Sequence, residues 1–239
     1  MGVILFNGIS SEDFGVHIAK PPIYQIPERD ITSTFIPGRS GGAIVRIGGF
    51  KDVTREYEAS FPAYSDFSER TAAIARWLFS SSGYAKLSDT YDPDVYRLAY
   101  CQSSIDVESL YQEAGRFTIS FNCKPQRYLN QGSEPIIVTD NREVSLLNPT
   151  GMEAAPTIEI RGNGFVKLFF NDQTVSISNL TSEVLTIDCE NEIAYVGSSL
   201  ANDRIITPNG YPTLPAGVSK IKWIGDVTEF RIIPRWWSI

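Results

Sequence analysis

Apolar and polar side chains alternate along most of the chain, and this period of two predicts a protein built mainly of β-strands. The alternation is clearest at residues 51–62, where Arg55 interrupts the apolar face, and at residues 117–123. Other strands are predicted at 4–6, 15–18, 84–87, 95–101, 136–139, 144–147, 157–161, 165–170, 174–177, 184–188, 193–196, 220–224 and 228–233. The many short strands after residue 135 are typical of a β-sandwich.

Residues 66–80 depart from this alternation and predict the one long helix. Their apolar side chains recur at helical spacing and form one stripe, made of Phe67, Thr71, Ile74, Trp77 and Leu78. Ser65 or Asp66 can cap the first turn, Glu69 completes a capping box, and Gly83 follows the end of the pattern. A single helix in a β-rich chain is expected to cover one face of a sheet, with Trp77 in the core.

Two strand patterns, residues 31–36 and 43–47, flank the Gly-rich sequence PGRSGG at 37–42. They predict a hairpin arm with more apolar surface than a free hairpin should expose, so the arm is expected to contact a partner. The alternative is that residues 37–49 form only a mobile hairpin. The candidate interface residues are Phe35, Ile36, Arg39, Ile44, Val45, Arg46 and Ile47.

The best linker candidate is residues 130–135, where Asn, Gly, Ser and Pro gather and the helical pattern has already ended. It predicts two domains, residues 1–130 and residues 131–239. The 239 residues carry 21 basic and 28 acidic side chains, a net charge of −7, which does not suit a sequence-specific nucleic-acid reader. No apolar run approaches the roughly 20 residues of a membrane span, so membrane insertion is not expected.

Residues that would support catalysis or metal binding are scarce. The one histidine, His17, has no evident Ser or Cys partner, and three widely spaced cysteines form neither a disulfide framework nor a zinc pattern. Asp89, Asp92 and Asp94 could suggest a calcium loop, but Pro93 interrupts it and the terminal Glu is missing. A solvated loop is the preferred interpretation, and we expect neither an enzyme nor a cofactor or metal.

Several short motifs occur in an order that resembles the distal tail proteins of long, non-contractile-tailed bacteriophages. In the first domain these are FNG at 6–8, DFGV at 13–16, PGRSGG at 37–42, WL at 77–78, LSD at 87–89, DPDVYRLA at 92–99, GRF at 115–117 and FNCKP at 121–125. In the second they are NPTG at 148–151, APTIEI at 155–160, GNG at 162–164, LTID at 185–188 and LPAG at 214–217. Each motif is weak alone, and the ordered set spans nearly the whole chain.

The resemblance implies a mostly β protein with an N-terminal ring-forming (belt) domain, which holds the helix and the arm, and a C-terminal galectin-like β-sandwich. It also implies a structural hub at the tail tip or baseplate of the virion, assembled in the bacterial host cytoplasm. The expected partners are further copies in a hexameric ring, the tail tube protein, the tape measure protein, and tail-associated hub, lysin or receptor-binding proteins. DNA would pass through the ring.

The alternative from another functional class is a carbohydrate-binding module that contacts the host cell surface. Trp236 and Trp237 are the candidates for stacking on a sugar ring, although they can equally pack on the edge of the sandwich, with Trp223 in the strand core. The second domain contains no histidine, so it cannot hold the His-Asn-Arg-Trp set of true galectins. A cell-wall hydrolase is a third and more distant alternative.

Overall fold

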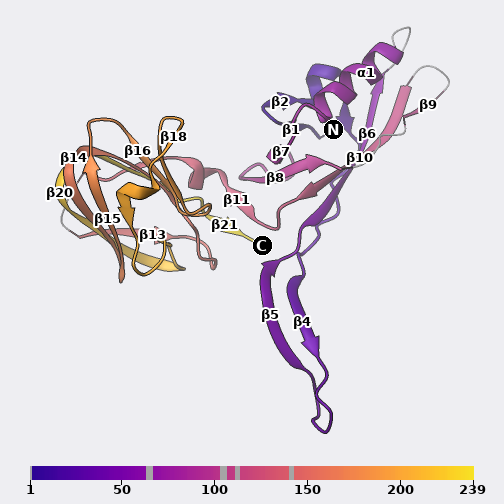
Figure 1. Cartoon of the computed structure of the whole chain (residues 1–239). Helices are drawn as coiled ribbons and strands as arrows, with labels where there is room; N and C mark the ends of the chain where they lie inside the picture. Colours follow the sequence, from indigo (N-terminus) through magenta and orange to yellow (C-terminus); the bar gives the residue numbers. More distant parts are fainter. Residues whose placement is uncertain (1, 63–66, 103–106, 111–113, 140–142) are drawn as a thin grey trace. The chain divides into compact units, whose positions relative to one another are not determined.

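A computed structural model describes residues 2–62, 67–102, 107–110, 114–139 and 143–239, with side chains at all of these except 45–48 and 108–110. The described chain is mostly β-strand, as the alternation predicts, and contains one α-helix, α1 (Figure 1). It divides into two compact units, residues 1–127 with residue 239 (unit 1) and residues 128–238 (unit 2). The sequence placed a boundary between residues 130 and 131, and the division in the structure falls between residues 127 and 128.

The main sheet of unit 1 is antiparallel, with strand order β2-β1-β7-β8-β10-β6-β3. Its strands are β1 (Ile4–Phe6), β2 (Ile9–Ser10), β3 (His17–Ile18), β6 (Val53–Pro62), β7 (Ala85–Asp89), β8 (Val95–Cys101) and β10 (Ala114–Cys123). The short strand β9 (Glu108–Leu110) pairs with β10, and a 3-10 helix, η1 (Ser11–Phe14), follows β2.

The pairing of β6 with β10 is the longest in this sheet and runs without a break from Val53↔Cys123 to Pro62↔Ala114. Odd-numbered side chains of both strands point into the core, so Tyr57 and Phe121 are buried. The ring of Phe121 lies 4.9 Å from that of Phe6 on β1. The predicted alternation of these two strands is therefore confirmed.

Helix α1 (Phe67–Leu78) packs on this core through the predicted apolar stripe. Ile74, Trp77 and Leu78 are buried, and the indole Nε1 of Trp77 donates to the backbone oxygen of Phe6 at 3.3 Å. The helix ends before the predicted residue 80, where the hydroxyl of Ser80 donates to the carbonyl of Trp77 at 2.8 Å and satisfies a terminal acceptor. The predicted capping residues at 65 and 66 lie outside the described residues.

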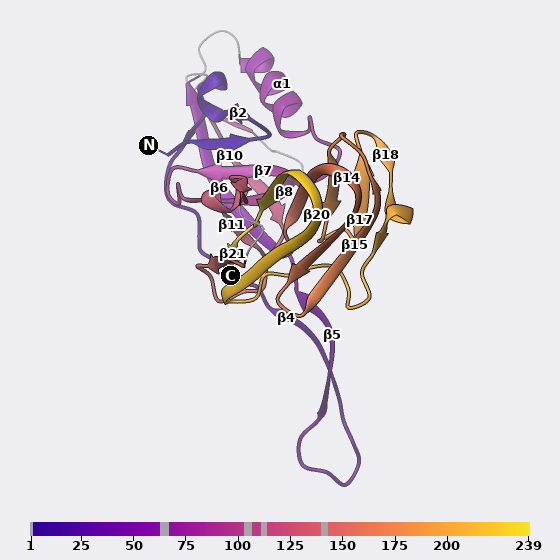
Figure 2. The ribbon, with the colours of Figure 1, turned by 90° about the vertical axis from the view of Figure 1, so that its left-hand side faces the viewer.

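Strands β4 (Arg29–Thr34) and β5 (Ala43–Phe50) form a separate antiparallel two-stranded sheet, the arm. β4 has the predicted length but begins and ends two residues earlier than predicted, and β5 is three residues longer than predicted. Figures 1 and 2 show the arm extending away from the rest of unit 1. The turn between them requires left-handed backbone at Gly38 and Gly41, whose φ angles are +79° and +82°. This conformation explains the Gly-rich tip.

Unit 2 is built around two long antiparallel strands, β14 (Thr157–Phe170) and β20 (Gly217–Ile233). The principal strand order is β12-β20-β14-β16-β17-β18, with β13 on β20, β15 on β14 and β19 on β15. The remaining elements are β11 (Arg127–Leu129), η2 (Asn130–Ser133), β12 (Ile136–Ile137), β13 (Val144–Asn148), β15 (Gln173–Leu180), β16 (Leu185–Asp188), β17 (Ile193–Val196), β18 (Ser199–Leu200), η3 (Asn202–Arg204), β19 (Ile205–Ile206) and β21 (Trp237–Ser238).

Register shifts in the middle of β14 and β20 let each strand serve two sets of neighbours. The first half of β14 pairs with β16 and the second half with β15, although the sequence predicted separate strands. A side chain at Gly162 would place its Cβ 2.0 Å from the backbone oxygen of Asp226, so the shift requires glycine there. The galectin-like character of unit 2 stays a prediction.

We predict that Trp77→Ala destabilises unit 1 by roughly 3–5 kcal/mol, the usual cost of removing a buried Trp, and leaves unit 2 unchanged. Phe79→Ala is the matched control, because Phe79 is 52% exposed on the same segment and should cost little. Hydrogen exchange read peptide by peptide is the suitable measurement. Trp77 is the one tryptophan of unit 1, so its substitution removes the fluorescence signal that would report the unfolding of that unit. Equal protection of unit 1 in both variants would contradict the core role of α1.

Burial also governs the thiols. It raises the pKa of Cys123 to about 12 and that of Cys189 to about 12, so both stay protonated at neutral pH. We predict that a chromogenic aryl disulfide at pH 8 reacts with at most one thiol, Cys101, in the folded protein and with all three in denaturant. Rapid reaction of two or more native thiols would show that a core opens.

Candidate assembly surface

The arm exposes large apolar side chains instead of burying them. Phe35 is 75% exposed and Ile44 is 68% exposed, and Ile31 and Ile36 are also open to solvent. Because Ser33 lies opposite Ile44 and side chains alternate along β4, Ile31 and Ile44 share one face of the hairpin. Isolated exposed side chains are common, but several on one thin ribbon make the arm a candidate contact surface.

The other predicted interface residues also belong to the arm. Arg39 is exposed at the tip, next to Gly38. Val45, Arg46 and Ile47 are part of β5, and their side chains lie outside the described ones. The structure therefore brings the predicted set together on one hairpin, and whether these residues contact a partner stays a prediction.

The backbone of the arm is also incompletely paired. Within the described residues β4 and β5 pair with each other and with no third strand. Each strand therefore keeps an outer edge of N–H and C=O groups, which another chain can extend by strand addition. A two-stranded ribbon is only marginally stable in water, and such a partner would stabilise it.

The root of the arm is fixed to the body by local contacts. The backbone N–H of Lys51 donates to the carbonyl of Glu28 at 2.9 Å, and its ammonium lies 3.3 Å from the carboxylate of the same residue. The guanidinium of Arg29 lies 5.1 Å from the centre of the Phe50 ring. These contacts hold the first residues of the hairpin together, whereas the apolar side chains farther out are left exposed.

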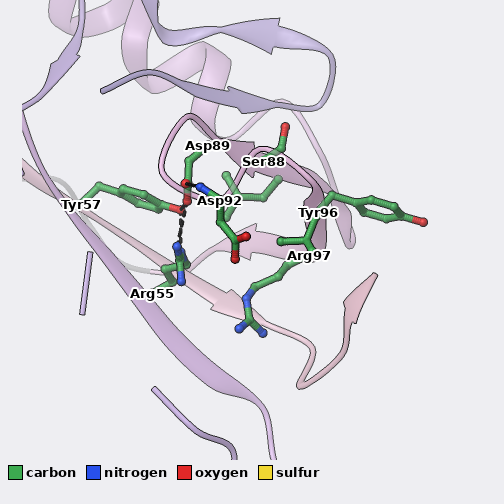
Figure 3. A pocket seen from close by; sticks show the side chains of 9 residues that line it. Arg55, Tyr57, Ser88, Asp89, Asp92, Tyr96 and Arg97 are labelled. Atoms are coloured by element: carbon green, nitrogen blue, oxygen red, sulfur yellow. Dashed lines mark hydrogen bonds and ion pairs between the residues drawn. The ribbon is translucent and has the colours of Figure 1, made fainter. Parts of the chain in front are cut away.

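Next to the root, β6 carries a buried group of polar residues that Figure 3 shows from close by. The guanidinium of Arg55 lies 2.9 Å from Oδ2 of Asp89 and donates to the hydroxyl of Tyr57 at 2.8 Å. The Tyr57 hydroxyl donates to the same Oδ2 at 2.6 Å. The other oxygen of Asp89 accepts the backbone N–H groups of Tyr91 and Asp92. The charge that interrupts the apolar face of β6 is thus compensated inside the protein.

The environment fixes the ionisation of these groups. Burial lowers the pKa of Arg55, but Tyr57 and Asp89 outweigh it and raise the pKa above its ordinary value. Burial raises the pKa of Tyr57 well above its ordinary value, so its phenol stays neutral.

The buried Arg97, whose pKa burial lowers, donates to the backbone oxygen of Pro125 at 3.4 Å. The cavity here has a volume of about 10 Å³, room for one water and not for a substrate.

Comparison with known proteins shows which of them share this fold. Residues 58–123 match the family model described as the phage tail protein RIFT-related domain. The chain is similar to the crystal structure of SPP1 Dit (gp 19.1), described as a paradigm of the hub adsorption apparatus in phages that infect Gram-positive bacteria. That match has a TM-score of 0.70 and 12% identity, and covers 97% of this chain and 98% of the other.

Residues 58–123 are therefore similar to a phage tail domain, and the chain has the fold of SPP1 Dit. The resemblance to siphophage distal tail proteins that the sequence motifs indicated is therefore confirmed. A second similar structure is the phage p2 baseplate in its activated conformation with Sr, with a TM-score of 0.54, 11% identity, and coverage of 97% of this chain and 96% of that one. No curated protein matches the chain.

The matched phage tail domain runs from β6 through α1 to β10 and leaves the arm outside it. At these identities the likeness to Dit establishes the fold of the whole chain. It does not transfer the residues of an interface from one protein to the other. The assembly surface of this Dit-like chain must therefore be argued from its own exposed side chains.

The tryptophans suggested for sugar stacking form no open platform. Trp236 is 4% exposed and belongs to the core of unit 2, and Trp223 is buried in the same core. Trp237 is half-buried and donates Nε1 to the backbone oxygen of Glu153 at 2.9 Å. In this arrangement the rings support the packing of unit 2 and leave no broad aromatic face for a sugar.

The acidic loop at residues 89–94 also differs from the expected solvated loop. The side chain of Asp89 is 5% exposed and serves Arg55 and Tyr57, and Asp92 forms an ion pair with Arg127. The sequence could not show that Asp89 and Arg55 meet, because they lie 34 positions apart.

No cluster of three metal-ligating His, Cys, Asp or Glu side chains occurs among the described residues. None of the described helices is long and apolar enough to cross a membrane.

We predict that Asp89→Ala destabilises unit 1 by roughly 3–5 kcal/mol, because it leaves the Arg55 charge buried without its partner. Asp94→Ala, on the exposed side of the same loop, should have little effect. Replacing Arg55 and Asp89 together by Leu should recover part of the loss, which denaturant titration of all the variants would measure. A double variant no more stable than Asp89→Ala would contradict the pairing.

Proposed function

We propose that this protein is the structural hub of a long, non-contractile phage tail. Copies of the chain form a hexameric ring that joins the tail tube to the tail-tip or receptor-binding apparatus and lets DNA pass. The observation that carries the proposal is the Dit fold over the full length of the chain, together with the phage tail domain at residues 58–123. The protein acts at the tail tip of the virion, after assembly in the host cytoplasm.

The partners proposed for such a hub occupy different faces. Further copies of the chain lie beside it in the ring, the tail tube and tape measure proteins lie on one side, and hub, lysin or receptor-binding proteins lie on the other. The proposed role is mechanical and needs no catalysis, cofactor or sequence-specific DNA contact.

The arm is the proposed element of ring assembly. Cyclic rings use heterologous contacts, in which one patch of a subunit meets a different patch of its neighbour. A projecting hairpin with exposed Ile31 and Ile44 on one face and two open strand edges suits such a contact. Burying these side chains against a neighbour would also stabilise the hairpin itself. The carbohydrate-binding alternative has less support, since Trp236 is buried.

We predict that the parent protein forms a complex of about 160 kDa in light scattering, six times the 26.6 kDa chain. The variant Ile31→Asp/Ile44→Asp should raise the concentration of half-assembly by a factor on the order of 100, because burying an Ile is worth about 1.5–3 kcal/mol. At a concentration where the parent is also monomeric, the variant should melt like the parent, since both side chains are exposed in the single chain.

Thr32→Asp/Thr34→Asp is the matched control, because it adds the same charge at exposed positions on the opposite face of β4. Equal assembly of the parent, the control and the Ile31/Ile44 variant would show that the arm is not an assembly element. A parent that stays monomeric at every concentration would overturn the proposal that the ring forms from this chain alone.

A further inference from the structure

A groove runs along the outer face of β6, close to the root of the arm. None of the residues that line the groove is among the site residues predicted from the sequence. Its wall is the segment at residues 20–26, here called the strap, which leads from β3 toward the arm. The wall presents Ile23, which is 85% exposed, and Ile26, which is 71% exposed. The floor carries the carboxylates of Glu56 and Glu58, and the volume is about 660 Å³.

The groove exists because the strap does not complete the sheet. β3 pairs with β6 only at His17↔Ser60 and Ile18↔Ala59, and the next backbone bond joins Ala19 N–H to the carbonyl of Glu58 at 2.9 Å. Pairing resumes only at the arm root, where Lys51 N–H bonds to Glu28. The eight residues 20–27 therefore lie opposite the six residues 52–57, so this segment is two residues longer than the strand that it faces. Pro21 and Pro22 in the strap, and Pro27 directly after it, have no N–H to donate.

One length of strand edge is therefore left open in the described chain. Successive backbone groups of a strand point to alternate edges, and those of Thr54 and Glu58 point to the strap, where Thr54 N–H finds the side chain of Gln25 at 3.2 Å. By the same alternation the N–H and C=O of Glu56 point to the strap, and no strand lies opposite them. This edge can accept an added strand.

The strap is held in place, so the groove keeps its shape without a ligand. The hydroxyl of Tyr24 donates to the backbone oxygen of Ile239 at 3.3 Å, and the guanidinium of Arg127 lies 5.0 Å from the centre of the Tyr24 ring. Lys20 forms an ion pair of 2.6 Å with Glu58. A preformed groove with an apolar wall, an acidic floor and an open strand edge fits an extended segment that carries apolar and basic side chains.

The arm has this chemistry. Residues 29–46 carry Arg29, Arg39 and Arg46 against Asp30, a net charge of +2 on a chain whose remainder carries −9. Phe35 and Ile44 supply exposed apolar side chains, and both strand edges are open. The arm cannot fill the groove of its own chain, because its tip lies about 25 Å beyond a root that is fixed beside the groove.

We propose that the groove between the strap and β6 receives the arm of a second copy of this chain. The contact is head to tail, as a closed ring requires, with Phe35 or Ile44 against Ile23 and Ile26 and the arginines near Glu56. The inference rests on the proposed ring and names the receptor of its arm.

Complementation tests the direction of the contact. The groove variant Ile23→Asp/Ile26→Asp and the arm variant Ile31→Asp/Ile44→Asp should each stay monomeric where the parent forms rings. At a concentration where the parent is also monomeric, both should melt like the parent, because the four side chains are exposed. Mixed together, the two variants retain one intact arm and one intact groove, so they should form a dimer of about 53 kDa, twice 26.6 kDa, and nothing larger.

Cross-linking gives an independent readout. In a Cys101→Ser background, Ile23→Cys with Phe35→Cys should give a ladder of covalent multiples with a short bis-maleimide. Phe35→Cys with Ile206→Cys, which is 66% exposed in unit 2, is the control and should give at most a trace. The native Cys123 and Cys189 are buried and should not react.

The outcomes separate the inference from the function on which it rests. If the groove variant forms rings like the parent, or the Ile23 and Phe35 cysteines fail to cross-link within rings, the groove is not the receptor, and the hub proposal survives. If the groove variant forms rings but is not incorporated into tails, the groove takes another tail protein, and the inference is overturned. If the parent forms rings neither alone nor in assembled tails, both proposals fail.

Discussion

A β-strand has two edges to satisfy, and the way in which β6 satisfies them organises unit 1. One edge of β6 pairs with β10 over its whole length, and this ladder carries Tyr57 and Phe121 into the core under α1. The other edge pairs with β3 at two positions only, because the proline-containing strap cannot continue the ladder. Between the strap and β6 the chain forms the arm, in which β4 pairs with β5. The core, the groove and the arm are therefore consequences of one strand with unequal edges.

The parts of the fold that follow from local periodicity could be predicted from the sequence. A period of two places every other side chain of β6 and β10 on the buried face, and a period near 3.6 gathers Ile74, Trp77 and Leu78 on one side of α1. The hairpin could also be predicted, because the glycines at its tip allow the left-handed turn that its two strands need. These signals act within a few residues of each other, so no knowledge of the distant chain is required.

Features that depend on distant segments could not be predicted in the same way. Arg55 looked like an interruption of a core face, and only the approach of Asp89 from β7 shows why a charge is stable there. The long strands β14 and β20 looked like four strands, because their glycine-dependent register shifts are set by the neighbouring backbone. The exposed Ile23 and Ile26 gave a signal, apolar residues among prolines, but their meaning depends on the open edge of β6.

Electrostatics sets a condition on any ring made from this chain. Each copy carries a net charge of −7, so neighbouring bodies repel one another, and this repulsion weakens as salt screens it. Ion pairs at an exposed rim contribute little, so the attraction must come mainly from apolar burial. In the proposed contact a basic arm on an acidic body would ease this conflict, because it would place the positive charge of one copy beside the carboxylates of the next. The charge pattern then favours contact between different patches over contact between like ones, which is the geometry that closes a ring.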